Sequence, residues 1–150
     1  LPHRLQPLGE KDGIKYYDDS ISTICETTIQ ALNTLKDVDT VLIGGMDRGI
    51  DYSELINFLS GHKVPHIILM EATGKRILEE ILNGYPDFQD KDRLVLTDHL
   101  EDAVAKAKEL TRPGHSCLVS PAAASYGIFK NFEERGEVFA RLVSESDKLM

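Results

Sequence analysis

Short apolar runs alternate along this chain with stretches of helical periodicity. Runs typical of buried strands lie at 39–45, 64–70, 93–97 and 117–120. After each of them, and over 24–35, apolar residues recur at three- and four-residue intervals, which predicts a helix. Two earlier strand-like runs, 4–8 and 14–19, flank an Asp12-Gly13 turn and predict an antiparallel hairpin. The pattern predicts an α/β, Rossmann-like three-layer αβα domain, with a mainly parallel sheet of about six strands and the hairpin at one edge.

The expected helix starts carry local capping signals. In three places a threonine or aspartate precedes a glutamate by three residues, the spacing of a capping box: Thr23 and Glu26, Asp51 and Glu54, Asp98 and Glu101. The last helix is expected to follow the small-residue run 120–125 directly, with Ser125 as its N-cap. Its buried stripe would then hold Ile128, Phe129, Phe132, Val138, Phe139 and Leu142.

Three loops with distinctive polar chemistry follow expected strands, at 19–23, 44–49 and 120–125. Ligands of such folds bind where loops leave the carboxyl ends of the strands, so these loops should converge. Thr23 and Ser125 offer hydroxyls beside expected helix N-termini, and Arg48 offers a planar cationic fork that suits a carboxylate. The combination favours a carboxylate-recognition site. Capping alone would account for Thr23, and a solvated surface position would account for Arg48.

Composition narrows the functional classes. The 150 residues suit one domain, and the formal net charge of −8 argues against a nucleic-acid binder. No apolar run approaches about 18 residues, so no membrane span is predicted. Cys25 and Cys117 lie far apart without a CxxC, which indicates reduced thiols in a cytoplasmic protein. The histidines show no spacing typical of a zinc site, and no metal site is expected.

The familiar nucleotide and nucleophile motifs are absent from the sequence. The fragment 72–75 ends in Gly-Lys but has Leu69 where a phosphate-binding loop needs its first glycine. The glycines at 44, 45 and 49 do not form GxGxxG, and neither Ser120 nor Ser125 lies in a G-x-S-x-G elbow. The chain is therefore expected to lack ATP-hydrolysing machinery of its own.

Four ordered blocks resemble the C-terminal domain of Mur ligases, most closely the MurD type. They are Leu1-Pro-His-Arg4, Tyr17-Asp-Asp-Ser20 with Thr23, Gly44-Gly-Met-Asp-Arg-Gly49, and the segment 120–136 with its Phe129-Lys-Asn-Phe-Glu-Glu-Arg-Gly136. The likeness covers essentially the whole chain. It implies a ligase of three domains, in which 1–150 is the C-terminal, glutamate-binding domain. An N-terminal UDP-binding domain and a central ATPase domain would lie outside this chain.

The resemblance also implies an activity. Such ligases use ATP and Mg²⁺ to convert the carboxylate of UDP-N-acetylmuramoyl-L-alanine into an acyl phosphate, which the amine of D-glutamate attacks, in peptidoglycan synthesis. The intact protein would be a monomeric cytoplasmic enzyme that binds neither nucleic acid nor membrane. Because nucleotide and metal are held mainly by the central domain, the 150 residues alone are expected to be inactive.

By position, the resemblance assigns roles to residues of two groups. The glutamate pocket would be formed by Thr23, Arg48, Ser125, Tyr126 and Phe132. His3, Arg4 and Asp19 would touch ATP from this side, positioning it and stabilising charge rather than transferring protons. No catalytic residue is expected in this chain. Each role has an alternative. Tyr126 and Phe132 could pack in the core, His3 and Arg4 could lie at a solvated domain junction, and Asp19 could be an acid at a helix start.

The sequence departs from the family pattern at three positions. Ile21 stands where a lysine is common, Arg48 stands where many relatives have lysine, and Ala123 replaces the usual cysteine. Loss of a cation at position 21 leaves open whether the ligase uses D- or L-glutamate.

Two alternatives lie outside this assignment. A folylpolyglutamate-synthase-like ligase is disfavoured by the block 120–136. A receiver-type signalling domain would use Asp18 and Asp19 as its acidic pair. The third strand, however, ends at Leu69-Met70 without a phospho-acceptor aspartate, and no lysine follows the last strand.

Overall fold

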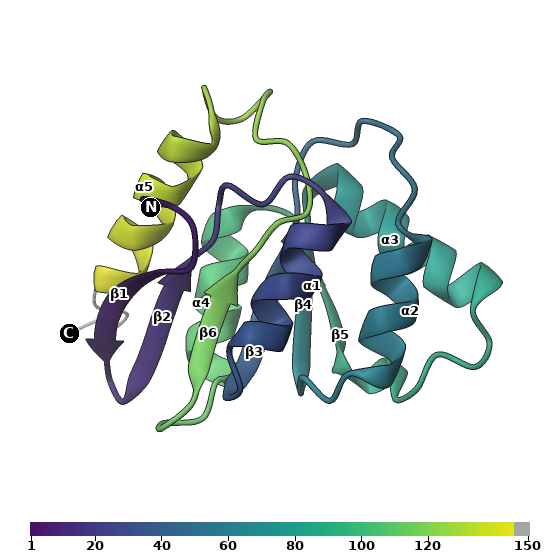
Figure 1. Cartoon of the computed structure of the whole chain (residues 1–150), viewed down its shortest axis with the longest axis horizontal. Helices are drawn as coiled ribbons and strands as arrows, with labels where there is room; N and C mark the ends of the chain where they lie inside the picture. The colour runs from purple at the N-terminus through teal and green to yellow at the C-terminus, as the bar shows by residue number, and fades with distance from the viewer. Residues whose placement is uncertain (146–150) are drawn as a thin grey trace.

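A six-stranded sheet in the order β1-β2-β6-β3-β4-β5 forms the middle layer of the fold (Figure 1). The computed structural model describes residues 1–145. The strands are β1 (Gln6–Lys11), β2 (Ile14–Asp18), β3 (Val38–Gly44), β4 (His66–Met70), β5 (Leu94–Thr97) and β6 (Ser116–Val119). The helices are α1 (Cys25–Thr34), α2 (Ser53–Gly61), α3 (Glu71–Gly84), α4 (Leu100–Leu110) and α5 (Phe132–Ser144), with a 3-10 turn, η1 (Lys91–Arg93), before β5.

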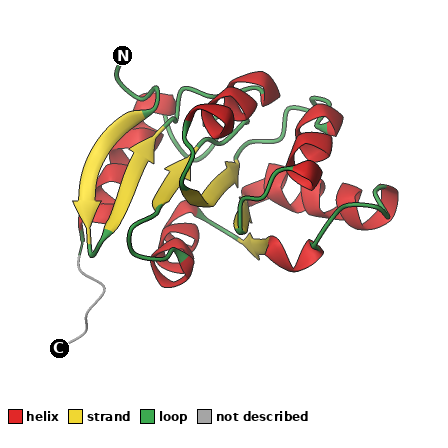
Figure 2. Ribbon diagram, turned by 60° about the horizontal axis from the view of Figure 1, so that its bottom comes forward, coloured by secondary structure: helices red, strands yellow, loops and turns green. Residues whose placement is uncertain are grey.

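The predicted edge hairpin is confirmed. β1 pairs antiparallel with β2 at one side of the sheet (Figure 2), and the other neighbouring strands of the described sheet pair parallel. Asp12 and Gly13 make the turn with φ of 54° and 83°, the left-handed conformation that two-residue hairpin loops require. The predicted α/β class, the mainly parallel sheet and its six strands are likewise confirmed.

Two apolar clusters fill the space on either side of the sheet. One cluster packs α1, α2 and α3 against Val41, Ile43, Ile67 and Leu69. The other packs α4 and α5 against Leu42, Ile68 and Met70. Successive residues of β3 and β4 thus face opposite layers, and each strand is buried on both sides, which explains its continuous apolar run. The three-layer prediction is therefore confirmed.

The three predicted capping boxes are wrong. α1, α2 and α4 each begin one residue later than expected, with Ile24, Tyr52 and His99 as N-caps, and none of these caps forms a side-chain hydrogen bond. Asp51 still serves the start of α2, because its Oδ1 accepts a hydrogen bond from the Ser53 N–H at 2.9 Å. Tertiary packing of the loops fixes these helix starts more strongly than local capping preference does.

The predicted start of the last helix is also wrong. α5 begins at Phe132, and the Asn131 side chain caps it by accepting from the Glu134 N–H at 2.9 Å. Residues 120–131 form a loop, in which Ile128 is 55% exposed rather than buried on a helix. Phe129 packs at the edge of the core from this loop. Within residues 1–145, none of the helices combines the length and apolar character that a membrane crossing needs.

Candidate functional site

The strand order brings the three polar loops together. β6 lies between β2 and β3 and runs parallel to both, so their carboxyl ends meet at one edge of the sheet. Two contacts fasten the loops to one another there. The Met46 N–H donates to the Ala124 carbonyl at 2.9 Å, and the Ala122 N–H donates to the Ser22 carbonyl at 3.0 Å. The convergence predicted from the sequence is confirmed.

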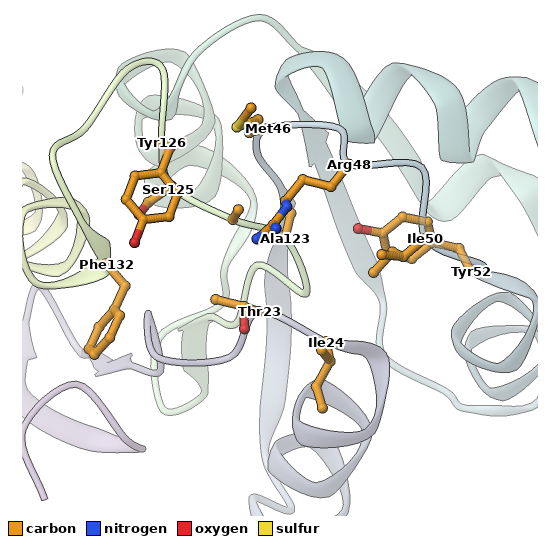
Figure 3. A pocket seen from close by; sticks show the side chains of 11 residues that line it. Thr23, Ile24, Met46, Arg48, Ile50, Tyr52, Ala123, Ser125, Tyr126 and Phe132 are labelled. Atoms are coloured by element: carbon orange, nitrogen blue, oxygen red, sulfur yellow. The ribbon is translucent and has the colours of Figure 1, made fainter.

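A cavity of about 430 Å³ opens between these loops (Figure 3). All five residues of the predicted glutamate pocket contribute to its lining: Thr23, Arg48, Ser125, Tyr126 and Phe132. The rest of the lining is Ile24, Met46, Ile50, Tyr52, Ala123 and Ala124. The lining thus carries one cation and no acidic side chain, although the chain as a whole has a net charge of −8. This charge pattern suits an anionic ligand.

The Arg48 side chain extends into the middle of this cavity, with Ser125, Tyr126 and Phe132 toward one side and Tyr52 toward the other (Figure 3). Within residues 1–145, no hydrogen bond or ion pair engages its guanidinium. An arginine fork without a protein partner can bind a carboxylate through two parallel hydrogen bonds.

The backbone around Arg48 is held in place by Asp47 and Arg76. Asp47 accepts from the Gly49 N–H at 2.9 Å and from Arg76 Nε at 2.8 Å. Arg76, on α3, also donates to the Ile50 carbonyl at 2.8 Å. The loop that carries Arg48 is therefore fixed to α3, while the Arg48 side chain remains available to a ligand.

Tyr52 fixes the opposite wall. Its hydroxyl donates to the Ala122 carbonyl at 2.6 Å, and burial raises the pKa of the phenol to about 12. The phenol therefore stays protonated and holds the loop after β6 against α2. Ser125, 6% exposed, lies at the end of the buried part of that loop and not at a helix N-terminus. The helix dipole expected behind Ser125 is thus absent from this position.

The residues predicted to touch ATP lie together beside this cavity. Asp19 is buried, and its carboxylate accepts from the Leu5 N–H at 3.0 Å, from the Ser120 hydroxyl at 2.7 Å and from the Ser22 hydroxyl. Burial raises the pKa of Asp19, and these hydrogen bonds oppose the shift. Arg4 is exposed and lines a small neighbouring cavity with Asp19.

Ile21 faces that small cavity rather than the larger one. The small cavity measures about 90 Å³ and is lined by Arg4, Asp19 and Ile21 among others. With Ile21 in place of the lysine common in the family, the small cavity of Arg4 and Asp19 lacks the cation that a lysine would supply at position 21. The larger cavity keeps its cation, Arg48.

Arg135 is the most unusual charged residue near the site. It is 1% exposed, and its Nη2 donates to the Ser20 carbonyl at 2.8 Å. Its Nε and Nη1 have no hydrogen-bond partner among the described residues. Burial lowers the pKa of the guanidinium to about 10, against the opposing charges of Glu71 and Asp18. Arg135 is therefore still a cation at neutral pH, and it lies close to Gly45, where an added Cβ would be 3.2 Å from Nη1.

Known proteins match this chain over nearly its whole length. No protein-family model matches the chain. The UDP-N-acetylmuramoylalanine–D-glutamate ligase of Caldanaerobacter subterraneus is 38% identical over 146 residues, which is 97% of this chain. The ligase of the same name from Chlamydia caviae is 36% identical over 148 residues, or 99% of this chain. The chain belongs to the Mur ligases, as a C-terminal domain of the MurD type. It spans 31% and 33% of the lengths of these two relatives.

Solved Mur ligase structures share the fold. A murein peptide ligase from Psychrobacter arcticus superposes with a TM-score of 0.64 over 99% of this chain, at 14% sequence identity. The MurF ligase from Thermotoga maritima, solved in complex with ADP, superposes with a TM-score of 0.54 over 96% of this chain, at 18% identity. The chain covers 31% and 32% of those structures. The resemblance drawn from the four sequence blocks is confirmed.

Sequence reasoning missed several residues of the candidate site. Tyr52 and Ile50 follow the glycine loop as ordinary apolar residues, and nothing in their spacing marks them as cavity walls. Asp18 forms a hydrogen-bonded pair with His3, which no local pattern indicates. Among residues 1–145, no cluster of three histidine, cysteine, aspartate or glutamate side chains is placed to hold a metal ion.

Proposed function

We propose that the intact protein containing this chain is an ATP-dependent ligase that joins D-glutamate to UDP-N-acetylmuramoyl-L-alanine in peptidoglycan synthesis. The observation that carries the proposal is the cavity at the three-loop junction. It gathers Thr23, Arg48, Ser125, Tyr126 and Phe132 around a single cation, with no acid in the lining. The matching relatives are named as D-glutamate ligases, which agrees with such a site.

In the proposed reaction, this domain binds and orients the incoming amino acid. Arg48 would hold one carboxylate of glutamate by a bidentate pair, and the hydroxyls of Thr23 and Ser125 would hydrogen-bond to the substrate. Tyr126 and Phe132 would form the wall beside the aliphatic part of the substrate. The amine would attack the acyl phosphate carbon, and phosphate would leave through a tetrahedral intermediate. The contribution of this domain is positioning, because no lining side chain is placed to act as a general base.

ATP is proposed to bind mainly to a central domain outside this chain, together with Mg²⁺. His3, Arg4 and Asp19 would approach the nucleotide from this side. The Asp19 carboxylate already accepts hydrogen bonds from Leu5, Ser22 and Ser120. Asp19 would therefore maintain the shape of the loop, and Arg4 would provide the positive charge near the nucleotide. The 150 residues alone would then be inactive. The intact enzyme is proposed to be a cytoplasmic monomer.

The test is phosphate release by the intact protein with UDP-N-acetylmuramoyl-L-alanine, ATP and Mg²⁺, comparing D- with L-glutamate. We expect phosphate release that depends on D-glutamate. Ile21, the residue that left the enantiomer open, lies outside the cavity of Arg48. Release with L-glutamate alone would keep the ligase chemistry but overturn the stereochemical assignment. No glutamate-dependent release would overturn the proposed function.

A further inference from the structure

His3, one of the residues predicted to touch ATP, also contacts a residue of the predicted glutamate pocket. Its ring Nδ1 is 2.6 Å from Asp18 Oδ2, and its carbonyl accepts from the Ile21 N–H at 3.1 Å. On the other side, the His3 ring meets the Phe132 ring edge to face, with centroids 6.2 Å apart and planes at 78°. Phe132 in turn lines the cavity of Arg48 (Figure 3).

The position of His3 is strongly determined by its surroundings. Its backbone has φ of 65°, a conformation that non-glycine residues adopt rarely and keep only when neighbouring contacts impose it. The His3 N–H donates to Gln6 Oε1 at 2.8 Å. The partner carboxylate of Asp18 is 1% exposed and also accepts from the Ser20 N–H at 2.9 Å. Both backbone and ring are therefore fixed.

Gly136 makes this arrangement possible. It lies on α5 one turn after Phe132, and a Cβ there would collide with His3 Nδ1 and with the Asp18 carboxylate. Only a glycine lets the His3–Asp18 pair lie directly against the helix that carries Phe132. The first turn of α5, the leading segment of the chain and the end of β2 are thus packed into one unit.

We propose that His3 is a positioning residue for the glutamate cavity: held by Asp18, its ring sets the place of Phe132 and so couples the leading segment to the cavity wall. The inference rests on the proposed function, because it assigns a second role to a residue expected to touch ATP. A contact between nucleotide and His3 would then change glutamate binding, and glutamate would change nucleotide binding to the same extent.

The test uses steady-state kinetics of the intact ligase at saturating ATP and UDP-N-acetylmuramoyl-L-alanine. His3→Asn keeps a donor toward Asp18 but removes the ring, and is expected to raise the KM for glutamate about three- to tenfold, the range typical of one aromatic contact. Asp18→Asn, which loosens the ring without removing it, should raise the same KM by a smaller factor. The matched control is His115→Asn, the same substitution at a histidine just before β6 that lines neither the Arg48 cavity nor the small cavity of Arg4 and Asp19, and it should leave the glutamate KM within about twofold.

A double-mutant cycle separates coupling from independent damage. His3→Asn combined with Phe132→Leu should raise the glutamate KM by clearly less than the product of the two single effects. The proposal is overturned if His3→Asn changes the KM for ATP but not the KM for glutamate. It is also overturned if the effects of the two substitutions on the glutamate KM multiply. Failure of the proposed function is a separate result, since the unmodified enzyme would then show no turnover that depends on glutamate.

Discussion

The Asp19 carboxylate accepts a hydrogen bond from the Ser120 hydroxyl at 2.7 Å, which joins the loop after β2 to the loop after β6. Ser120 Oγ also lies 3.0 Å from Thr28 Oγ1 on α1. These three side chains are buried, and 92 residues separate Thr28 from Ser120. A buried polar network thus connects α1 to two of the three loops that surround the candidate site, and loss of one member is expected to be costly.

Removing the Ser120 hydroxyl should destabilise the domain. Ser120→Ala leaves Asp19 with fewer donors in a buried position, so the free energy of unfolding is expected to fall by about 1–3 kcal/mol. Urea denaturation measures the change. The matched control is Ser144→Ala, whose exposed hydroxyl donates to the Arg141 carbonyl, and which should change stability by less than about 0.5 kcal/mol. Equal effects at the two serines would contradict the network.

Gly136 on α5 should tolerate substitution poorly. Gly136→Ala places a Cβ against the His3–Asp18 pair, and the resulting overpacking is expected to lower the free energy of unfolding by about 1–3 kcal/mol. Gly61→Ala is the control, because a Cβ at this last residue of α2 meets nothing within 4 Å. The helix propensity of alanine should make Gly61→Ala neutral or stabilising by up to about 1 kcal/mol. Thermal unfolding compares the two, and a neutral Gly136→Ala would contradict the close packing.

Lowering the pH should reduce the free energy of unfolding of the domain, because Asp39 becomes protonated. Burial tends to raise the pKa of this carboxyl, but hydrogen bonds from the Arg112 side chain and backbone, with the guanidinium charge, lower it below the usual value. A lowered pKa in the folded state stabilises the fold above the unfolded pKa of about 4, and this contribution disappears as pH falls through the folded value.

Asp39→Asn tests this dependence. At pH 7 the variant is expected to be less stable by about 1.5–3 kcal/mol, the range for hydrogen bonds to a charged group. The difference from the unmodified domain should shrink as the pH is lowered below about 4. Denaturation curves across pH 3–7 measure it, and a constant difference over that range would contradict the ion pair as its origin.

The sequence was most informative where burial decides the structure. The run Asp39–Gly45 and the run Val64–Met70 predicted β3 and β4, because strands buried on both faces need continuous apolar residues. The polar loops after β2, β3 and β6 predicted where the cavity lies, since parallel strands end at the same edge. The order β2-β6-β3, which places these loops side by side, was not itself predictable from local patterns.

Helix starts and the last loop were poorly predicted, and for a common reason. Thr23 and Ser125 are good N-cap types, so local preference assigned them to helix ends. In the structure, Ala122 and Ala124 bond to Ser22 and Met46, and these long-range contacts keep residues 120–125 in a loop. The same contacts leave Thr23 and Ser125 lining a cavity instead of capping a helix. The contact of His3 with Phe132 is likewise tertiary and carries no sequence signal.

The central claim is that the cavity around Arg48 binds the glutamate carboxylate, and one kinetic comparison tests it most directly. In the intact ligase, Arg48→Ala should raise the KM for D-glutamate strongly, by the equivalent of about 2–3 kcal/mol, with the KM for ATP little changed. Lys75→Ala is the matched control, because Lys75 lines the neighbouring cavity and not that of Arg48. A glutamate KM for Arg48→Ala close to that of Lys75→Ala and of the unmodified enzyme would contradict the account.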